Sequence, residues 1–178
     1  MLNALLIILV VLAIVVVAIL AIASTKPDVF RVRRTARIKA SPQRIFALLN
    51  DFHHWQEWSP WERMDPALNR RYSGASSGVG AVYDWQGNKK VGQGRMEITD
   101  SVPYSRLGIK LDFISPFEAH NTVDFTLVPM GEETEIVWDM QGPNTFVTKI
   151  MHTLMNMDRM VGKDFESGLA NLKTAAEK

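Results

Sequence analysis

The sequence of 178 residues has no cysteine, no internal repeat and no low-complexity tract. The missing cysteines remove thiolates as metal ligands, and they agree equally with a reducing and an oxidising compartment. The net charge of +1 and the lack of a nucleic-acid-binding motif argue against DNA or RNA as a partner. These absences argue against nucleic-acid binding and exclude metal sites built from thiolates.

Catalytic motifs are also missing. No nucleophile elbow occurs, and the glycine-containing stretches "GQG" and "SSGVG" lack the strand-turn-helix context of a phosphate-binding loop. The adjacent His53 and His54 would point about 100° apart on a helix, and only His120 and His152 remain as imidazole partners. We therefore expect no metal site and no cofactor, and we assign no catalytic residue.

The N-terminal segment is almost wholly apolar. Between Leu2 and Ala23 only Asn3 is polar, and the segment has no polar stripe of the kind that a soluble core helix shows. As a helix it would span roughly 33 Å, against about 30 Å of bilayer hydrocarbon. A cleaved secretory signal is the alternative, but such signals have a basic start and an apolar stretch of only about 7 to 15 residues. We expect a transmembrane anchor over residues 1–24.

Flanking charge indicates the direction of this helix. No lysine or arginine precedes it, and only Asp28 opposes the basic residues that follow it. Those residues are Lys26, Arg31, Arg33, Arg34, Arg37, Lys39 and Arg44. The positive-inside rule then predicts a cytoplasmic C-terminal domain. Residues 25–29 form a short linker, so this domain, residues 30–178, should sit close to the bilayer.

The remainder alternates between strand and helix patterns. Residues 30–38 alternate apolar and basic side chains, and Ser41 followed by Pro42 begins a short helix. Five further strands are expected at 81–86, 91–99, 106–114, 121–128 and 134–140, joined as an antiparallel meander. A single long helix is expected over 145–176, where Gly162 and Gly168 indicate a bend or a close approach to the sheet. The fold class is α+β, a curved sheet covered by the C-terminal helix.

Several stretches together resemble one superfamily. They are "DFHHWQEWSPWERMDP", "YSGASSGVGAVYDWQGN", "VGQGRMEITDSVP", "KLDFISPFEAHNTVDFTL" and "MDRMVGKDFESGLANLK". From about residue 30 to 173 the chain resembles the helix-grip superfamily of START domains, polyketide cyclases and birch-pollen allergens (SRPBCC), in its membrane-anchored polyketide cyclase-like branch. The resemblance implies a hydrophobic cavity between the sheet and the long helix, but no particular reaction.

Candidate ligand-binding residues are those that the alternation along each strand, or the apolar side of an expected helix, predicts to face inward. On the strands they are Tyr83, Trp85, Met96, Leu111, Phe113, Phe125 and Trp138; the C-terminal helix adds Met151 and Met155, and the short helix in residues 51–66 adds Trp55 and Trp58. Methionine and aromatic side chains suit a cavity for varied apolar guests, although a packed core explains the same set. Arg34 also falls on the inward-facing side of its strand, and a buried guanidinium must be paired. It therefore either holds an anionic group of a ligand or forms an internal ion pair. A bulge that shifts the strand register by one residue would instead turn it outward.

The other face of the first strand is basic. Arg31, Arg33, Arg37 and Lys39 either contact anionic headgroups or form a solvated strand face. We expect a membrane-anchored protein that binds a hydrophobic small molecule or lipid, without assigned catalysis. One alternative is a polyketide cyclase or dehydratase, which needs a polar group with a shifted pKa facing the cavity. Another is an interaction module whose cavity is filled, which a cavity below about 300 Å³ favours.

Overall fold

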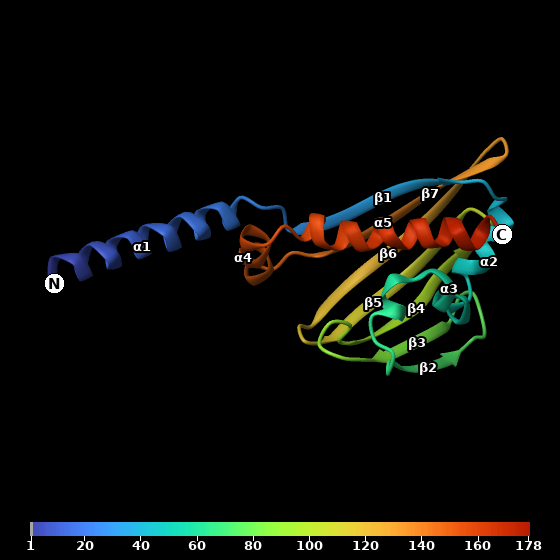
Figure 1. Cartoon of the computed structure of the whole chain (residues 1–178), viewed down its shortest axis with the longest axis horizontal. Helices are drawn as coiled ribbons and strands as arrows, with labels where there is room; N and C mark the ends of the chain where they lie inside the picture. The colour runs from blue at the N-terminus through green and yellow to red at the C-terminus, as the bar shows by residue number, and fades with distance from the viewer. Residues whose placement is uncertain (1) are drawn as a thin grey trace.

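The computed structural model describes residues 2–178 and consists of an apolar helix joined to an α+β domain (Figure 1). The helices are α1 (Leu2–Ser24), α2 (Pro42–Leu49), α3 (Trp55–Trp58), α4 (Phe146–Leu154) and α5 (Met157–Ala176), with short 3-10 helices η1 (Phe52–His54) and η2 (Pro60–Arg63). The strands are β1 (Val29–Ile38), β2 (Asn69–Gly74), β3 (Ala81–Gln86), β4 (Gln93–Val102), β5 (Arg106–Ser115), β6 (Ala119–Met130) and β7 (Glu133–Pro143).

The seven strands form one antiparallel sheet in the order β1-β7-β6-β5-β4-β3-β2. The predicted meander and the helix-grip arrangement are thereby confirmed. The sequence analysis missed β2, whose text "NRRYSG" has no alternation of apolar and polar residues. As an edge strand it pairs only with β3 and needs little burial, so its sequence carries a weak strand signal.

The C-terminal helix is not continuous, and this part of the prediction was wrong. Met155 has extended backbone angles (φ −126°, ψ 131°) and ends α4, while the side chain of Asn156 accepts a hydrogen bond of 2.9 Å from the amide of Arg159 and caps α5. The asparagine side chain favours a new helix start over helix continuation. Gly162 and Gly168 lie inside α5, where each permits close approach, to Arg34 and Trp138 respectively.

The two segments of the terminal helix cover different parts of the molecule. Figure 1 shows α5 running across the inner face of the sheet, where it packs along β1; α2 contacts both α5 and β6, and α3 contacts α5. In contrast, α4 packs against α1 at the end of the sheet where β1 begins and β7 ends. We call this end of the sheet the α1 end. It also carries the β3–β4 and β5–β6 turns, because Gln86 pairs with Gln93 and Phe113 with Ala119.

Candidate functional site

The middle of the inner face is a solid aromatic cluster. Trp58 lies 5.5 Å from Trp138 between ring centroids, and Trp138 stacks on Phe165 of α5 at 4.0 Å. Trp55 lies 4.8 Å from Trp58, and both rings pack edge-on against Phe125. All five side chains are buried. The cluster therefore fills the centre of the space between the sheet and α5.

Two hydrogen bonds hold the tryptophans of α3 in this cluster. The indole N–H of Trp58 donates to the carbonyl of Leu48, and that of Trp55 donates to the carbonyl of Leu49, each at 3.0 Å. Both acceptors lie at the end of α2, where helix carbonyls lack partners inside the helix. Trp58, which the sequence analysis selected as a ligand-binding residue, thus packs α3 onto the inner face of the sheet.

Toward the α1 end, the side chains of the inner face are less completely buried. Trp85, Met96, Leu111 and Met140 keep 6 to 9% of their surface exposed, and Phe113 is half-buried. By contrast, the residues farther along the same face include several that are fully buried: Ile98, Phe125 and Ile136 are 0% exposed. We call the group Trp85, Met96, Leu111, Phe113, Asn121 and Met140 the open end of the inner face.

Unpaired polar atoms occur on this face. Asn121 Oδ1 and Trp138 Nε1 are buried and have no hydrogen-bond partner in the described residues 2–178. A buried polar group without a partner costs about 1–3 kcal/mol, so such atoms call for a water molecule or a ligand. Asn121 lies on the same inward-facing side of its strand as Val123 and Phe125, and this alternation could have predicted its position. The sequence analysis left it out of the predicted site because its side chain is polar.

Arg34 forms an internal ion pair, one of the two outcomes that its parity left open. Its Nε lies 2.8 Å from Glu166 Oε1 and its Nη1 lies 3.0 Å from Asp158 Oδ1, both on α5. These two carboxylates raise the pKa of Arg34, so the guanidinium stays charged. Its Nη2 donates to the carbonyl of Asp158, and a Cβ at Gly162 would overlap the guanidinium. The side chain fastens β1 to α5.

Glu62 of η2 is buried between Arg70 and Tyr83, a polar cluster that the sequence analysis missed. Glu62 accepts a hydrogen bond of 2.6 Å from Arg70 Nε and another from the hydroxyl of Tyr83. Burial is the main cause that raises the pKa of Tyr83, and the neighbouring Glu62 raises it further, so the phenol remains protonated. Glu62 stands in a short stretch rich in aromatic residues and proline. This stretch shows no alternation of inward and outward side chains, so no sequence pattern predicted that Glu62 would be buried.

The histidines of residues 51–66 are engaged by neighbouring carboxylates. His53 Nδ1 lies 2.7 Å from Asp51, and His54 Nδ1 lies 2.8 Å from Glu57. The ring of His53 also stacks on Tyr72 at 4.1 Å. Each imidazole is about half exposed at the surface, and His53 lies beside the inner-face residue Tyr83 only through the ring of Tyr72.

Two predicted ligand-binding residues lie elsewhere. Met151 and Met155 were expected to face the sheet, and this placement was wrong because the helix ends at Met155 and α4 packs on α1 instead. Met151 is half-buried and Met155 is 44% exposed. The other predicted residues of the inner face, Tyr83, Trp85, Met96, Leu111, Phe113, Phe125 and Trp138, share it with Trp55 and Trp58.

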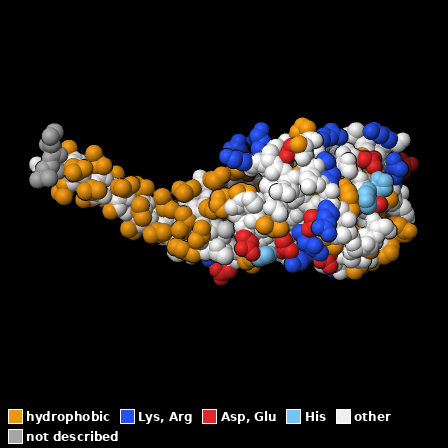
Figure 2. All heavy atoms as spheres, turned by 90° about the horizontal axis from the view of Figure 1, so that it is seen from below, with side chains coloured by type: hydrophobic (Ala, Val, Ile, Leu, Met, Phe, Trp, Pro, Cys, Tyr) orange, Lys and Arg blue, Asp and Glu red, His pale blue; other side chains and the backbone are white. Residues whose placement is uncertain are grey.

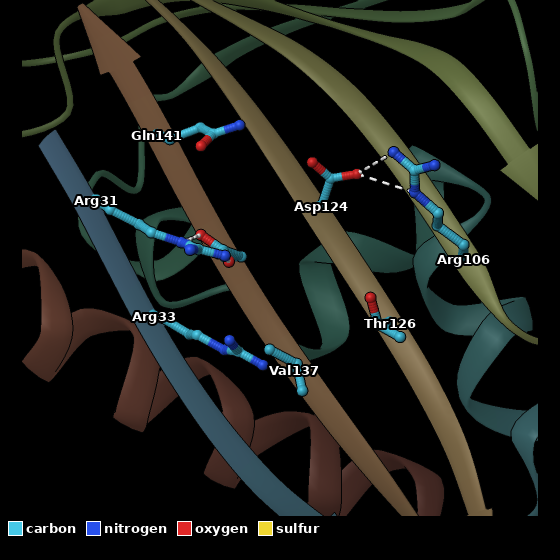
Figure 3. Close-up of a pocket in the computed structure, with 8 residues that line it drawn as sticks. Arg31, Arg33, Arg106, Asp124, Thr126, Val137 and Gln141 are labelled. Atoms are coloured by element: carbon cyan, nitrogen blue, oxygen red, sulfur yellow. Dashed lines mark hydrogen bonds and ion pairs between the residues drawn. The ribbon is translucent and has the colours of Figure 1, made fainter. Parts of the chain in front are cut away.

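The basic face of β1 is part of a charged outer surface. A hollow of about 260 Å³ lies on this surface. Figure 3 shows the residues that line it, where Arg31 pairs with Asp139 and Arg106 with Asp124. Strand geometry places Lys39 roughly 26 Å farther from α1 than Arg31. Of the two alternatives for the basic face, headgroup contact and a solvated strand face, the distance from α1 favours the solvated face for Arg37 and Lys39, whose strand runs away from α1.

A second hollow, of about 400 Å³, lies at the α1 end between the β3–β4 turn and Ser115 and Pro116. Neither of these hollows lies between the sheet and α5. These two hollows therefore do not supply the cavity that the resemblance implies. The open end is the part of the inner face where the side chains are least tightly buried.

A curved antiparallel sheet closed by a C-terminal helix over an apolar inner face defines a helix-grip protein. The family model for "Polyketide cyclase / dehydrase and lipid transport" matches residues 29–177, and the chain belongs to this family. The expected superfamily is thereby confirmed. A search of curated proteins finds no match.

Solved structures share the fold at low sequence identity. The di-domain ARO/CYC protein BexL from the BE-7585A biosynthetic pathway is 13% identical, with a TM-score of 0.65 over 89% of this chain and 53% of BexL. A protein of Chromobacterium violaceum is 14% identical, with a TM-score of 0.59 over 86% of this chain and 99% of that chain. Aha1 from Colwellia psychrerythraea is 17% identical, with a TM-score of 0.58 over 83% and 96%.

Proposed function

We propose that α1 anchors this protein in a membrane and that the open end of the inner face binds a hydrophobic small molecule or lipid. The observation that carries the proposal is the open end itself, where incompletely buried apolar side chains share the inner face with the unpaired Asn121 Oδ1, and Leu111 is the cross-strand partner of Asn121. Membership of a family described by polyketide cyclases, dehydrases and lipid transport supports a hydrophobic guest.

The surface of α1 supports the anchor. The segment Asn3–Ser24 has a mean hydropathy of 3.8, and none of its most apolar window is buried against the domain. The helix has 23 residues and is thus about 34 Å long, enough to cross the hydrocarbon core. A soluble protein does not leave such an apolar surface in water, because each Å² exposed costs about 25 cal/mol.

The chemistry of the open end indicates the kind of guest. Met96 and Met140 have flexible, polarizable side chains that can move to admit an apolar chain. Asn121 Oδ1 would accept a hydrogen bond from a hydroxyl or amide N–H of the guest and so gain its missing partner. Because the aromatic cluster blocks the rest of the inner face, the guest is held near the membrane anchor. The proposed mechanism is sequestration, without a chemical step.

Photolabelling tests this proposal. The full chain is purified in detergent with a fatty acid that carries a photoactivatable diazirine, irradiated, and digested for peptide mapping. We expect adducts within β5 and β6 around Leu111 and Asn121, in addition to adducts on α1, which reports the surrounding micelle. The distal residue Ile136 is buried on the same face and should remain unlabelled. Adducts confined to α1 and α4 would contradict ligand binding and favour a filled interaction module.

A cyclase or dehydratase is the second candidate, and the buried Glu62, Arg70 and Tyr83 cluster favours it. It supplies a carboxylate beside a protonated phenol on the inner side of the sheet. The mass of the small molecule that co-purifies with the protein separates the two functions. An enzyme yields a product in the wild type and an unchanged substrate, heavier by one water for a dehydratase, in Glu62→Gln. A binding protein yields the same molecule from both.

A further inference from the structure

We propose that α4 and the β5–β6 turn form a second contact with the bilayer, lying at the headgroup boundary beside the anchor. The membrane contact face consists of Phe146, Val147, Leu154 and Met155 of α4 and Phe117 of the turn. The proposal rests on the anchoring function proposed for α1. It adds a surface that fixes how the domain is held against the membrane.

The polarity of α4 is inverted relative to a helix that faces water. Its exposed residues are all apolar: Phe146 is 50% exposed, Val147 67% and Leu154 65%. Its one lysine, Lys149, is buried, with Nζ 2.6 Å from Asp28 Oδ1. A helix on an aqueous surface shows the reverse arrangement. The inverted pattern is the one expected where the outer side of the helix meets lipid.

The position of α4 matches the depth of the headgroup boundary. Among the described side chains of α1, those that lose exposure are Ile19 and Ala23, which are four residues apart and share one helix face near the C-terminal end. The element that packs on this end is α4. If α1 crosses the hydrocarbon core, its last turns lie at the boundary, and α4 lies there with them. Figure 2 shows the apolar surface continuing from α1 onto the adjoining end of the domain.

Hydrogen bonds to the linker fix α4 in this position. The amide of Asn144 donates to the carbonyl of Asp28 at 2.7 Å, and its side-chain Nδ2 donates to the carbonyl of Pro27 at 2.9 Å. With the ion pair between Lys149 and Asp28, these bonds join the segment after α1 to both the start and the middle of α4. The orientation of the contact face relative to the anchor is thereby set by the protein.

The β5–β6 turn supplies the second part of the contact face. Strand register puts this turn at the α1 end, and Phe117 at its tip is 67% exposed. An exposed phenylalanine in a turn at the same end as α4 extends the apolar face across the sheet. Together the two elements would hold the open end of the inner face next to the bilayer, so that a lipid could enter with little exposure to water.

Spin labelling of the cysteine-free chain tests the contact directly. Single variants Val147→Cys, Leu154→Cys and Phe117→Cys are labelled with a nitroxide in the full chain, in vesicles of phosphatidylcholine with one quarter phosphatidylglycerol. Leu12→Cys marks the anchor. Tyr104→Cys is the matched control, because this residue is 50% exposed in the β4–β5 turn at the opposite end of the sheet. The measured quantity is the ratio of oxygen to nickel-complex accessibility.

We expect this ratio at Val147, Leu154 and Phe117 to be several-fold higher than at Tyr104 and to approach the value at Leu12. If Val147 and Leu154 match Tyr104 while Leu12 reports lipid, the anchor stands and the α4 contact is overturned. A low ratio at Phe117 alone removes the turn from the contact face. A low ratio at Leu12 overturns the anchor and the inference with it. Circular dichroism of each variant checks that the labelled chain is folded.

Discussion

At the scale of single residues, the inner face combines tight aromatic packing with a few unpaired polar atoms. Trp58 contacts Trp55, Phe125 and Trp138 and donates its indole N–H to Leu48. Asn121 and Trp138, on the same face, each keep one buried polar atom without a partner in residues 2–178. We therefore expect stability to depend on the cluster, and the proposed guest to be held at the open end, where Asn121 lies.

Trp58→Ala should lower the free energy of unfolding by about 3–5 kcal/mol, because it empties a fully buried site and leaves the carbonyl of Leu48 without its donor. Phe117→Ala is the matched control, since an exposed phenylalanine contributes little, within about 0.5 kcal/mol. Urea unfolding of the full chain in detergent micelles measures both. Equal losses for the two variants would show that the cluster is not the core.

Asp164→Asn should raise the free energy of unfolding at about pH 7, by less than about 1 kcal/mol. Partial burial raises the pKa of Asp164 above its ordinary value of 3.8. The folded protein thus binds this proton more tightly than the unfolded chain, so stability falls as the pH rises through and just above 3.8. The gain from asparagine should disappear below that range, where the carboxyl is protonated in both states.

Asp158→Asn is the contrasting variant in the same helix. It weakens the ion pair with Arg34 and should lower stability at about pH 7, opposite in sign to Asp164→Asn. Thermal unfolding at about pH 7 and about pH 3 measures both variants. A gain for Asp164→Asn that persists at the lower pH would contradict the assignment to its carboxylate.

At the scale of elements, α5 approaches the sheet closely through its two glycines. An ideal Cβ at Gly168 would lie 2.8 Å from Trp138 Cζ3 and 3.2 Å from Pro60 Cδ. Trp138 cannot retreat readily, because the rings of Phe125 and Trp58 pack against it at 5.0 and 5.5 Å between centroids. The absent side chain at Gly168 thus lets the helix rest on the tryptophan ring.

Gly168→Ala should therefore lower the free energy of unfolding by about 1 kcal/mol. Alanine gains about 1 kcal/mol of helix propensity, but overpacking against Trp138 costs about 1–3 kcal/mol. The exposed neighbour Ser167→Ala is the control and should be neutral or slightly stabilising. Urea unfolding compares them. A stabilised Gly168→Ala would mean that α5 can move away from the sheet without loss.

At the scale of the whole molecule, the domain is held end-on to the anchor. The helix α1 extends from one end of the domain, and the sheet runs away from it, as Figure 1 shows. The short link between α1 and β1 is bound to Asn144 and Lys149, so the α1 end is kept beside the helix. This arrangement brings the open end, the β5–β6 turn and α4 to the same side of the molecule.

The charge pattern around α1 predicts that this domain lies on the cytoplasmic side. Basic residues follow the helix and none precedes it. A C-terminal fusion to green fluorescent protein, expressed in bacterial membranes, should fluoresce, and a fusion to alkaline phosphatase should be inactive. The reverse pattern would place the domain outside and leave the anchor itself intact.

The sequence by itself determined the features that arise from local periodicity. Alternation along each strand assigned the inward side chains, and an uninterrupted apolar run defined α1, because both patterns are set by backbone geometry within one element. It also identified most residues of the inner face, although it omitted Asn121, whose parity matched but whose polarity did not.

Only the tertiary structure decided how those side chains are used. Arg34 pairs with Glu166, which is 132 residues away, and Glu62 of η2 accepts a hydrogen bond from Tyr83 of β3, which is 21 residues away. No local pattern reports such contacts. The break after Leu154 likewise divides the one expected helix into two, and only the folded structure shows that α4 packs on α1 while α5 packs on the sheet. The filled centre of the inner face depends on how distant rings pack together, and that is a property of the folded molecule alone.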